Sequence, residues 1–100
     1  MTPETLAALA AALPAAAALL AAARPLDAVA YGCTSGATVI GPERVAEAIR
    51  VSHPAAAVTD PVSAAVAALL ALGARRIGVL TPYRADVSAA MRALLEREGF

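Results

Sequence analysis

The stretch that decides the fold runs from Asp27 to Gly36 and has the sequence DAVAYGCTSG. Residues 28–31 are short, apolar and β-competent, which predicts a strand that is buried on both faces of a parallel sheet. The strand stops near Cys33, and two glycines around this cysteine let the backbone bend and approach a ligand closely. Ligands of open α/β sheets lie outside the carboxyl ends of the strands, where this cysteine falls. The stretch therefore predicts either an anion site that holds a nucleophile or proton carrier, or a small cysteine packed in a turn.

Helical patterns precede and follow this stretch. Thr2 is expected as the N-cap of a first helix that runs toward Ala23, with an interruption near Pro14 because proline clashes with the preceding turn. A further helix is expected to start at residues 41–43. The segment around His53 is a polar breaker, so this histidine is predicted to lie in a surface loop without a catalytic role.

The second half of the chain repeats the alternation of strand and helix. A weak strand is expected at residues 56–59, and Asp60 is the predicted N-cap of a helix that ends before Gly73. Residues 77–81 form the clearest strand pattern, and an amphipathic helix follows up to Gly99. The order α-β-α-(β)-α-β-α predicts the α/β class, with a three-layer αβα arrangement around a parallel sheet.

Length and composition set limits on function. One hundred residues make at most one domain, and a formal net charge of zero gives no nucleic-acid footprint. One cysteine and one histidine exclude an internal disulfide and a structural zinc site within these residues. A free thiol is most useful in the reducing cytoplasm, which is the expected location. The apolar run Leu6–Ala23 is predicted to be a core helix, not a membrane span, because it is mostly alanine and contains Pro14.

Two blocks of the sequence resemble a known family. Residues 31–42, YGCTSGATVIGP, resemble the first-cysteine motif of the Asp/Glu racemase superfamily, in the branch of maleate cis-trans isomerases and arylmalonate decarboxylases. Residues 72–83, LGARRIGVLTPY, are similar to a family strand that ends in Pro-Tyr or Ala-Tyr. Residues 32–41 and 58–61 are most similar to the ectoine-utilisation proteins of this branch.

The resemblance implies that residues 1–100 are part of a longer fold. Members of this family consist of two similar α/β halves, and each half supplies one catalytic cysteine at their interface. Residues 1–100 are accordingly expected to be a single partial domain, the truncated first half of such a fold. Because only one cysteine is present, this segment is expected to be inactive alone, whereas the complete protein is expected to be an enzyme.

The expected chemistry needs hydrogen-bond donors around a substrate carboxylate, because negative charge builds up there in the transition state. The hydroxyls of Thr34, Ser35 and Tyr83 are candidate donors, and Thr59 after the weak strand is a further one. The resemblance implies that Cys33 is the acid/base or nucleophile, and it implies no cofactor and no metal. Because the decarboxylase branch has glycine at the position of Cys33, the resemblance favours an isomerase or racemase over a lyase.

Two classes of function stay open. The first is a cofactor-independent cysteine isomerase or racemase that acts on a small dicarboxylate or amino-acid-derived substrate, with a maleate isomerase-like or ectoine-catabolism role. No nucleic-acid or membrane partner is expected, and a homo-oligomer is compatible with this class. The alternatives are a non-catalytic remnant or carboxylate-binding module of the same fold, and an arylmalonate decarboxylase-like lyase.

Overall fold

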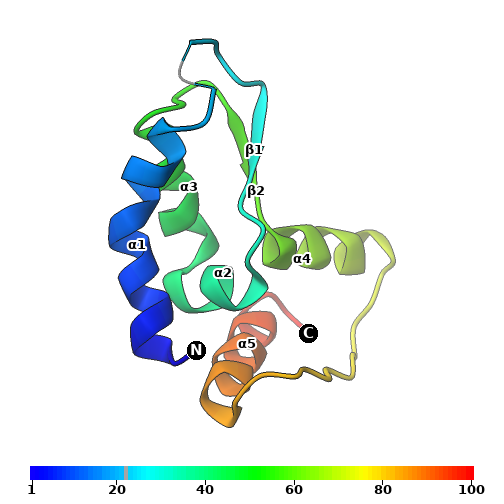
Figure 1. The fold of residues 1–100 in the computed structure, drawn as a ribbon. Helices are drawn as coiled ribbons and strands as arrows, with labels where there is room; N and C mark the ends of the chain where they lie inside the picture. The colour runs from blue at the N-terminus through cyan, green and yellow to red at the C-terminus, as the bar shows by residue number, and fades with distance from the viewer. Residues whose placement is uncertain (22) are drawn as a thin grey trace.

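The computed structural model describes residues 1–21 and 23–100. These residues form five helices and a two-stranded parallel sheet, a mixed α/β arrangement (Figure 1). The elements in chain order are α1 (Pro3–Ala18), β1 (Ala28–Ala30), α2 (Thr34–Ile40), α3 (Pro42–Arg50), β2 (Ala57–Thr59), α4 (Pro61–Ala71) and α5 (Ala85–Arg97).

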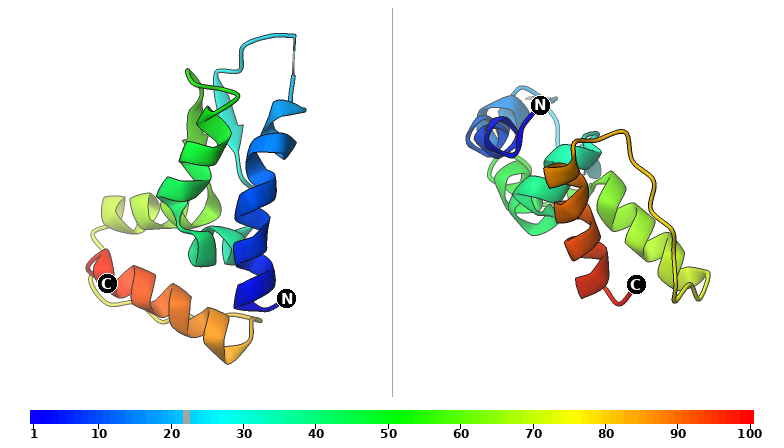
Figure 2. Two further views of the ribbon diagram at one scale, coloured as in Figure 1. Left: turned by 90° about the vertical axis from the view of Figure 1, so that its left-hand side faces the viewer. Right: turned by 90° about the horizontal axis from the view of Figure 1, so that it is seen from below.

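The small sheet is covered on one side only. β1 and β2 run parallel, with Ala28 opposite Ala57 and Ala30 opposite Thr59. Helices α1 and α3 lie side by side on one side of the strands (Figures 1 and 2). Val29 belongs to the core that packs there, and the other buried members of this core are Ala17, Ile40, Val45, Ile49 and Ala56. The side chains of Ala28 and Ala30 point to the opposite face and are exposed. The prediction of a strand buried on both faces is therefore wrong, although the strand itself is confirmed.

Helix α1 begins as the sequence predicts but continues past the expected interruption. Thr2 and Thr5 form a reciprocal capping box at its start. Pro14 lies inside the helix, which ends at Ala18. Because α1 packs against α2 and α3, with Leu6 wholly buried, tertiary contacts offset the hydrogen bond that the proline removes. The expected extension toward Ala23 is wrong, and Ala22 on that path lies outside the described residues.

Helix α2 was not expected, because its sequence is unfavourable for a helix. It contains Gly36 and ends in the β-branched run 38–40, both of which lower helix propensity. Its buried residues are Ser35, Gly36, Ala37, Thr38 and Ile40. The helix packs against α1, α3, α4 and α5, so burial and not intrinsic propensity stabilises it.

Helix α4 has the predicted ends. The Asp60 carboxylate accepts hydrogen bonds from the backbone N–H groups of Val62 at 2.9 Å and Ser63 at 3.0 Å. After the helix, Gly73 has a φ of +68°, and the N–H groups of Gly73 and Ala74 return to the carbonyls of Leu70 and Leu69. This is the Schellman arrangement that a glycine at C′ permits.

The strand predicted at residues 77–81 is not formed. The chain between α4 and α5 leaves the far end of α4 and descends to α5 without returning to the sheet (Figure 1). Val79 is 48% exposed and Leu80 is 100% exposed. An apolar β-rich segment becomes a strand only where a neighbouring strand accepts its backbone hydrogen bonds, and no described strand pairs with this segment. The amphipathic helix α5 that follows is confirmed, with Val87, Met91, Leu94 and Leu95 on its buried face.

His53 is buried, contrary to the prediction of a surface loop residue. It is 9% exposed, and its Nε2 lies 2.8 Å from the carbonyl oxygen of Ala17 in the last turn of α1. The Ala17 carbonyl also accepts the Leu20 N–H at 3.0 Å, so the imidazole is its second donor. This bond ties α1 to the connection between α3 and β2.

None of the described helices is long and apolar enough to cross a membrane.

Replacing His53 should destabilise the fold. We expect His53→Ala to lower the free energy of unfolding by about 0.5–1.5 kcal/mol, because the Ala17 carbonyl loses one of its two donors and keeps the Leu20 N–H. Urea-induced unfolding followed by circular dichroism measures this change. The neighbouring Ser52→Ala serves as a control, since the Ser52 hydroxyl makes only a long 3.5 Å bond to the Pro14 carbonyl. Equal effects of the two variants would contradict the role assigned to His53.

Candidate functional site

Cys33 lies between the carboxyl end of β1 and the first turn of α2. Its extended backbone places it at the N-cap of α2, where its Sγ accepts a hydrogen bond from the Gly36 N–H at 3.3 Å. The Ser35 hydroxyl lies 3.7 Å from the same sulfur. The thiol is half-buried and has no disulfide partner. The residue predicted to carry the chemistry therefore lies just after the strand end, with one backbone donor and one hydroxyl of α2 beside its sulfur.

The side chain of Tyr31 completes this cluster. Tyr31 and Cys33 are two residues apart in extended backbone, so their side chains leave the chain on the same side. The Tyr31 hydroxyl and the Cys33 sulfur both lie beside Gly36. Burial raises the pKa of the Tyr31 phenol above its ordinary value, and the negative charge of Cys33 raises this pKa further. The phenol therefore keeps its proton and stays a hydrogen-bond donor under conditions in which a thiolate is an acceptor.

Gly36 makes room for the Tyr31 hydroxyl. A β-carbon at this position would overlap the Tyr31 hydroxyl oxygen and would come within 3.1 Å of the Cys33 sulfur. Gly32, on the other side of the cysteine, has nothing within 4 Å of such a β-carbon. Of the two glycines that flank the cysteine motif, only Gly36 therefore has a neighbouring atom so close that no side chain fits there. The group that approaches is a side chain of the same chain, whereas the sequence analysis expected a ligand there.

The two hydroxyl residues after Cys33 have different surroundings. Ser35 is 9% exposed, and its hydroxyl is directed to the Cys33 sulfur. Thr34 is half-buried at the first position of α2, and its carbonyl accepts the Thr38 hydroxyl at 2.8 Å. Thr34 also lines a hollow of about 430 Å³ between α4, α5 and residues 77–80. The predicted pair is therefore divided, with Ser35 facing the thiol and Thr34 bordering the hollow.

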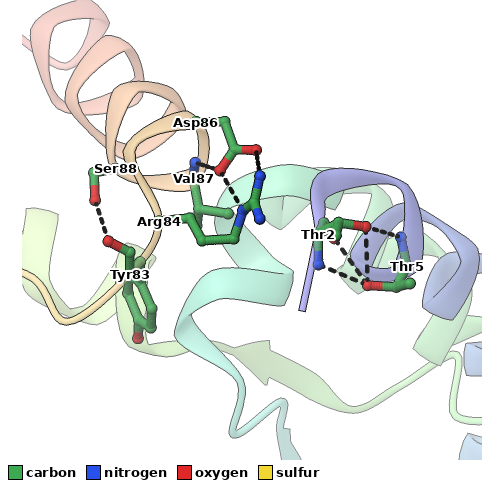
Figure 3. Close-up of polar contacts among 7 residues, drawn as sticks. All are labelled: Thr2, Thr5, Tyr83, Arg84, Asp86, Val87 and Ser88. Atoms are coloured by element: carbon green, nitrogen blue, oxygen red, sulfur yellow. Dashed lines mark hydrogen bonds and ion pairs between the residues drawn. The ribbon is translucent and has the colours of Figure 1, made fainter.

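Thr59 and Tyr83 are joined to the cluster less directly. The carbonyl of Thr59 accepts the Tyr31 N–H at 2.9 Å, which fixes the end of β2 next to the end of β1. Tyr83 does not follow a strand, because residues 77–81 are not paired in the sheet. Its carbonyl accepts the Ser88 hydroxyl (Figure 3). Among the described residues, no hydrogen bond connects Tyr83 with Cys33. The prediction that Tyr83 leaves the carboxyl end of a sheet strand is therefore wrong.

The charged residues near the start of α5 are paired with each other. Arg84 contacts Asp86 at 3.2 Å, and Figure 3 shows this pair close to the capping box at the start of α1. The hydrogen bond from Arg84 lowers the pKa of the Asp86 carboxyl. Both side chains are largely exposed, so this is a solvated surface pair. Arg84 is therefore a surface charge that is already paired with a carboxylate of its own chain.

Neither a metal centre nor a large cavity coincides with the cysteine. Among the described residues, no group of three or more His, Cys, Asp or Glu side chains lies close enough to hold a metal ion. The most voluminous hollow described, of about 700 Å³, lies against α5 and residues 77–81, and none of the predicted site residues lines it. The hollow that reaches Thr34 is therefore the one nearest to the expected chemistry.

No protein-family model, curated protein or solved structure matches this chain. The resemblance of residues 31–42 and 72–83 to the Asp/Glu racemase superfamily therefore stays a prediction. The site rests on the geometry of Tyr31, Cys33, Ser35 and Gly36. Of these, Tyr31 was assigned only to the strand in the sequence analysis. The signal for its role was the Tyr-x-Cys spacing, because residues i and i+2 of an extended chain share one face.

The close approach at Gly36 predicts a coupled pair of substitutions. Gly36→Ala should gain about 1 kcal/mol in helix propensity but clash with the Tyr31 hydroxyl, and overpacking costs about 1–3 kcal/mol. In a Tyr31→Phe background the hydroxyl is absent, so the same substitution should be more favourable by about 1–2 kcal/mol. A double-mutant cycle of unfolding free energies measures this coupling. Gly32→Ala is the matched control. A coupling energy between Gly36→Ala and Tyr31→Phe equal to the one between Gly32→Ala and Tyr31→Phe would contradict the close approach of the Tyr31 hydroxyl to Gly36.

The raised pKa of Tyr31 predicts a loss of stability at alkaline pH. The folded chain holds the phenol proton over a pH range in which the unfolded chain releases it. The contribution of the protonated Tyr31 phenol to stability is therefore present in full below the ordinary tyrosine pKa of about 10. It is lost as the pH rises through the pKa of Tyr31 in the folded chain. We expect the free energy of unfolding to fall more steeply above pH 10 in the wild type than in Tyr31→Phe. Parallel urea titrations across this range give the comparison, and identical slopes would refute it.

Proposed function

We propose that the chain is part of a cofactor-independent cysteine isomerase or racemase of the Asp/Glu racemase superfamily that acts on small carboxylates. The observation that carries this proposal is the position of the Cys33 sulfur, at the carboxyl end of a parallel strand with the Gly36 N–H directed to it. Hydrogen-bond donors fixed around a sulfur stabilise its anionic form without reorganisation during the reaction. The backbone and side-chain groups that surround Cys33 thus support thiolate chemistry.

The proposed chemistry has two variants that share one requirement. The Cys33 thiolate either removes the proton next to a carboxylate or adds to the alkene of an unsaturated dicarboxylate. In both variants electrons move toward the carboxylate, whose oxygens then need donors. Thr34 is suited to this role because it lies beside the sulfur-bearing residue and borders the hollow of about 430 Å³. Thr59 and Tyr83 are assigned no contact with the substrate in this proposal.

We further propose that the two-stranded sheet belongs to a three-layer αβα fold with a larger parallel sheet. Two features support this. The sheet face that carries Ala28 and Ala30 is exposed, although parallel sheets are normally covered on both faces. The apolar segment with Val79 and Leu80 has strand character but lacks a strand neighbour among the described residues. A second half of the kind that the resemblance implies would supply these contacts and a second cysteine, and a cytoplasmic location suits a free thiol.

The proposal is tested by substrate protection of the thiol. We expect maleate or aspartate at millimolar concentration to slow the alkylation of Cys33 by iodoacetamide several-fold, and Thr34→Ala to weaken this protection. Mass spectrometry of the modified chain measures the rate, and uncharged dimethyl succinate, a saturated ester that does not alkylate thiols, serves as a control ligand. Protection by the ester equal to that by maleate, or no protection at all, would contradict a carboxylate site.

A turnover assay tests whether residues 1–100 need a second thiol. Because proton transfer on two faces of a carbon needs groups on both faces, residues 1–100 should bind a carboxylate without converting it. The assays are conversion of maleate and racemisation of aspartate by the purified chain. Turnover that disappears in Cys33→Ser would show that one cysteine suffices, and the requirement for a second thiol would be wrong.

A further inference from the structure

The hydroxyl of Tyr31 is not explained by packing alone. The Tyr31 ring contacts both apolar clusters of the fold, the one around Val29 and the one formed by Ala37, Val62 and Leu94. A phenylalanine ring would make the same apolar contacts. The hydroxyl extends beyond them and reaches the first turn of α2 at Gly36, next to the Cys33 sulfur. Packing of the core therefore explains the Tyr31 ring but not its hydroxyl. It also does not explain why a glycine makes room for this hydroxyl.

We propose that Tyr31 is a positioning residue whose hydroxyl donates a hydrogen bond to the Cys33 thiolate and thereby sets the reactivity of this thiol. The inference rests on the proposed function, since it concerns the same sulfur, but its chemistry can be measured without any substrate. Hydrogen bonds to charged groups are about twice as strong as neutral ones, so a single phenol donor changes the thiolate population measurably. Together with the Gly36 N–H and the Ser35 hydroxyl, Tyr31 would give the sulfur three donors.

The electrostatics of the cluster fit this direction of donation. The Tyr31 pKa is raised, first by burial and then by Cys33, so the proton stays on the phenol when the sulfur becomes negative. No other charged side chain contributes to this rise. The buried carboxylate of Asp60 follows the neighbouring strand, but its oxygens are held by the N–H groups of Val62 and Ser63 and by the Ser63 hydroxyl. Because Asp60 follows the neighbouring strand end, the experiment separates the effect of its charge from that of Tyr31.

The test compares the pH profiles of Cys33 alkylation in the wild type and in Tyr31→Phe. Loss of one charge-assisted hydrogen bond should move the midpoint of the profile upward by about one pH unit, which is about a tenfold lower rate near neutral pH. The ultraviolet absorbance of the thiolate should shift in parallel. Tyr31→Phe keeps the ring, so the core contacts remain, and circular dichroism verifies the fold. Gly36→Ala, which displaces the hydroxyl by another route, should shift the profile in the same direction.

Two controls decide between this role and its rivals. Tyr83→Phe removes a phenol that has no hydrogen bond with Cys33 among the described residues, and it should leave the profile unchanged. Asp60→Asn keeps the helix cap but removes the charge, and it should also leave the profile unchanged. A wild-type profile in Tyr31→Phe, or an equal shift in Asp60→Asn or Tyr83→Phe, would overturn the proposal. If the pH profile is unchanged in Tyr31→Phe but maleate still protects Cys33, the role of Tyr31 is wrong and the proposed function stands. If the profile shifts but maleate gives no protection, the carboxylate site is wrong and the role of Tyr31 stands.

Discussion

The hydrogen bond from the Tyr31 N–H to the Thr59 carbonyl, 2.9 Å long, connects the parts of this structure to which we assign the proposed chemistry. It is the last bond between β1 and β2, and each strand leads from it almost directly into a helix. Cys33 caps α2 on one side, and Asp60 caps α4 on the other. Because both caps follow the same pair of strand ends, the position of one helix start relative to the other is fixed by the sheet. The same bond also fixes the backbone of Tyr31, whose hydroxyl lies against α2.

Local signals in the sequence were sufficient for the ends of most elements. The capping box at Thr2, the cap at Asp60 and the glycine at position 73 each act through groups only a few residues away. Such interactions need no knowledge of the rest of the fold, which is why they were predictable. Helix α2 shows the opposite case. Its glycine and β-branched residues disfavour a helix, and four neighbouring helices stabilise it through contacts that no local pattern reveals.

The two errors with the largest consequences have the same origin. Residues 77–81 have the composition of a strand, but composition does not state which strand will accept their hydrogen bonds. Tyr83 was placed in the site because it follows this segment and because the resemblance of residues 72–83 implies a carboxylate contact there. His53 was placed on the surface because of its polar neighbours, whereas a carbonyl at the end of α1, 36 positions earlier in the chain, provides its partner. In each case the decisive partner lies far away in the sequence, and a single chain gives no indication of it.

The cysteine itself was found by its place after a strand, but the structure changes what surrounds it. The hydroxyls that follow Cys33 were predicted as donors to a substrate carboxylate. The groups that the structure places next to the sulfur are the Gly36 N–H, the Ser35 hydroxyl and the phenol of Tyr31, which precedes the cysteine. At Gly36 the helix propensity of α2 and the space needed by the Tyr31 hydroxyl favour different residues. Alanine would favour α2 by about 1 kcal/mol, yet its β-carbon would occupy the position of the Tyr31 hydroxyl. The Tyr31 phenol can therefore lie next to the Cys33 thiol only because α2 has a glycine at position 36, which lowers the stability of this helix. The same glycine that lowers the stability of α2 lets the end of β1 act on the sulfur, which couples the packing of this helix to the reactivity of Cys33.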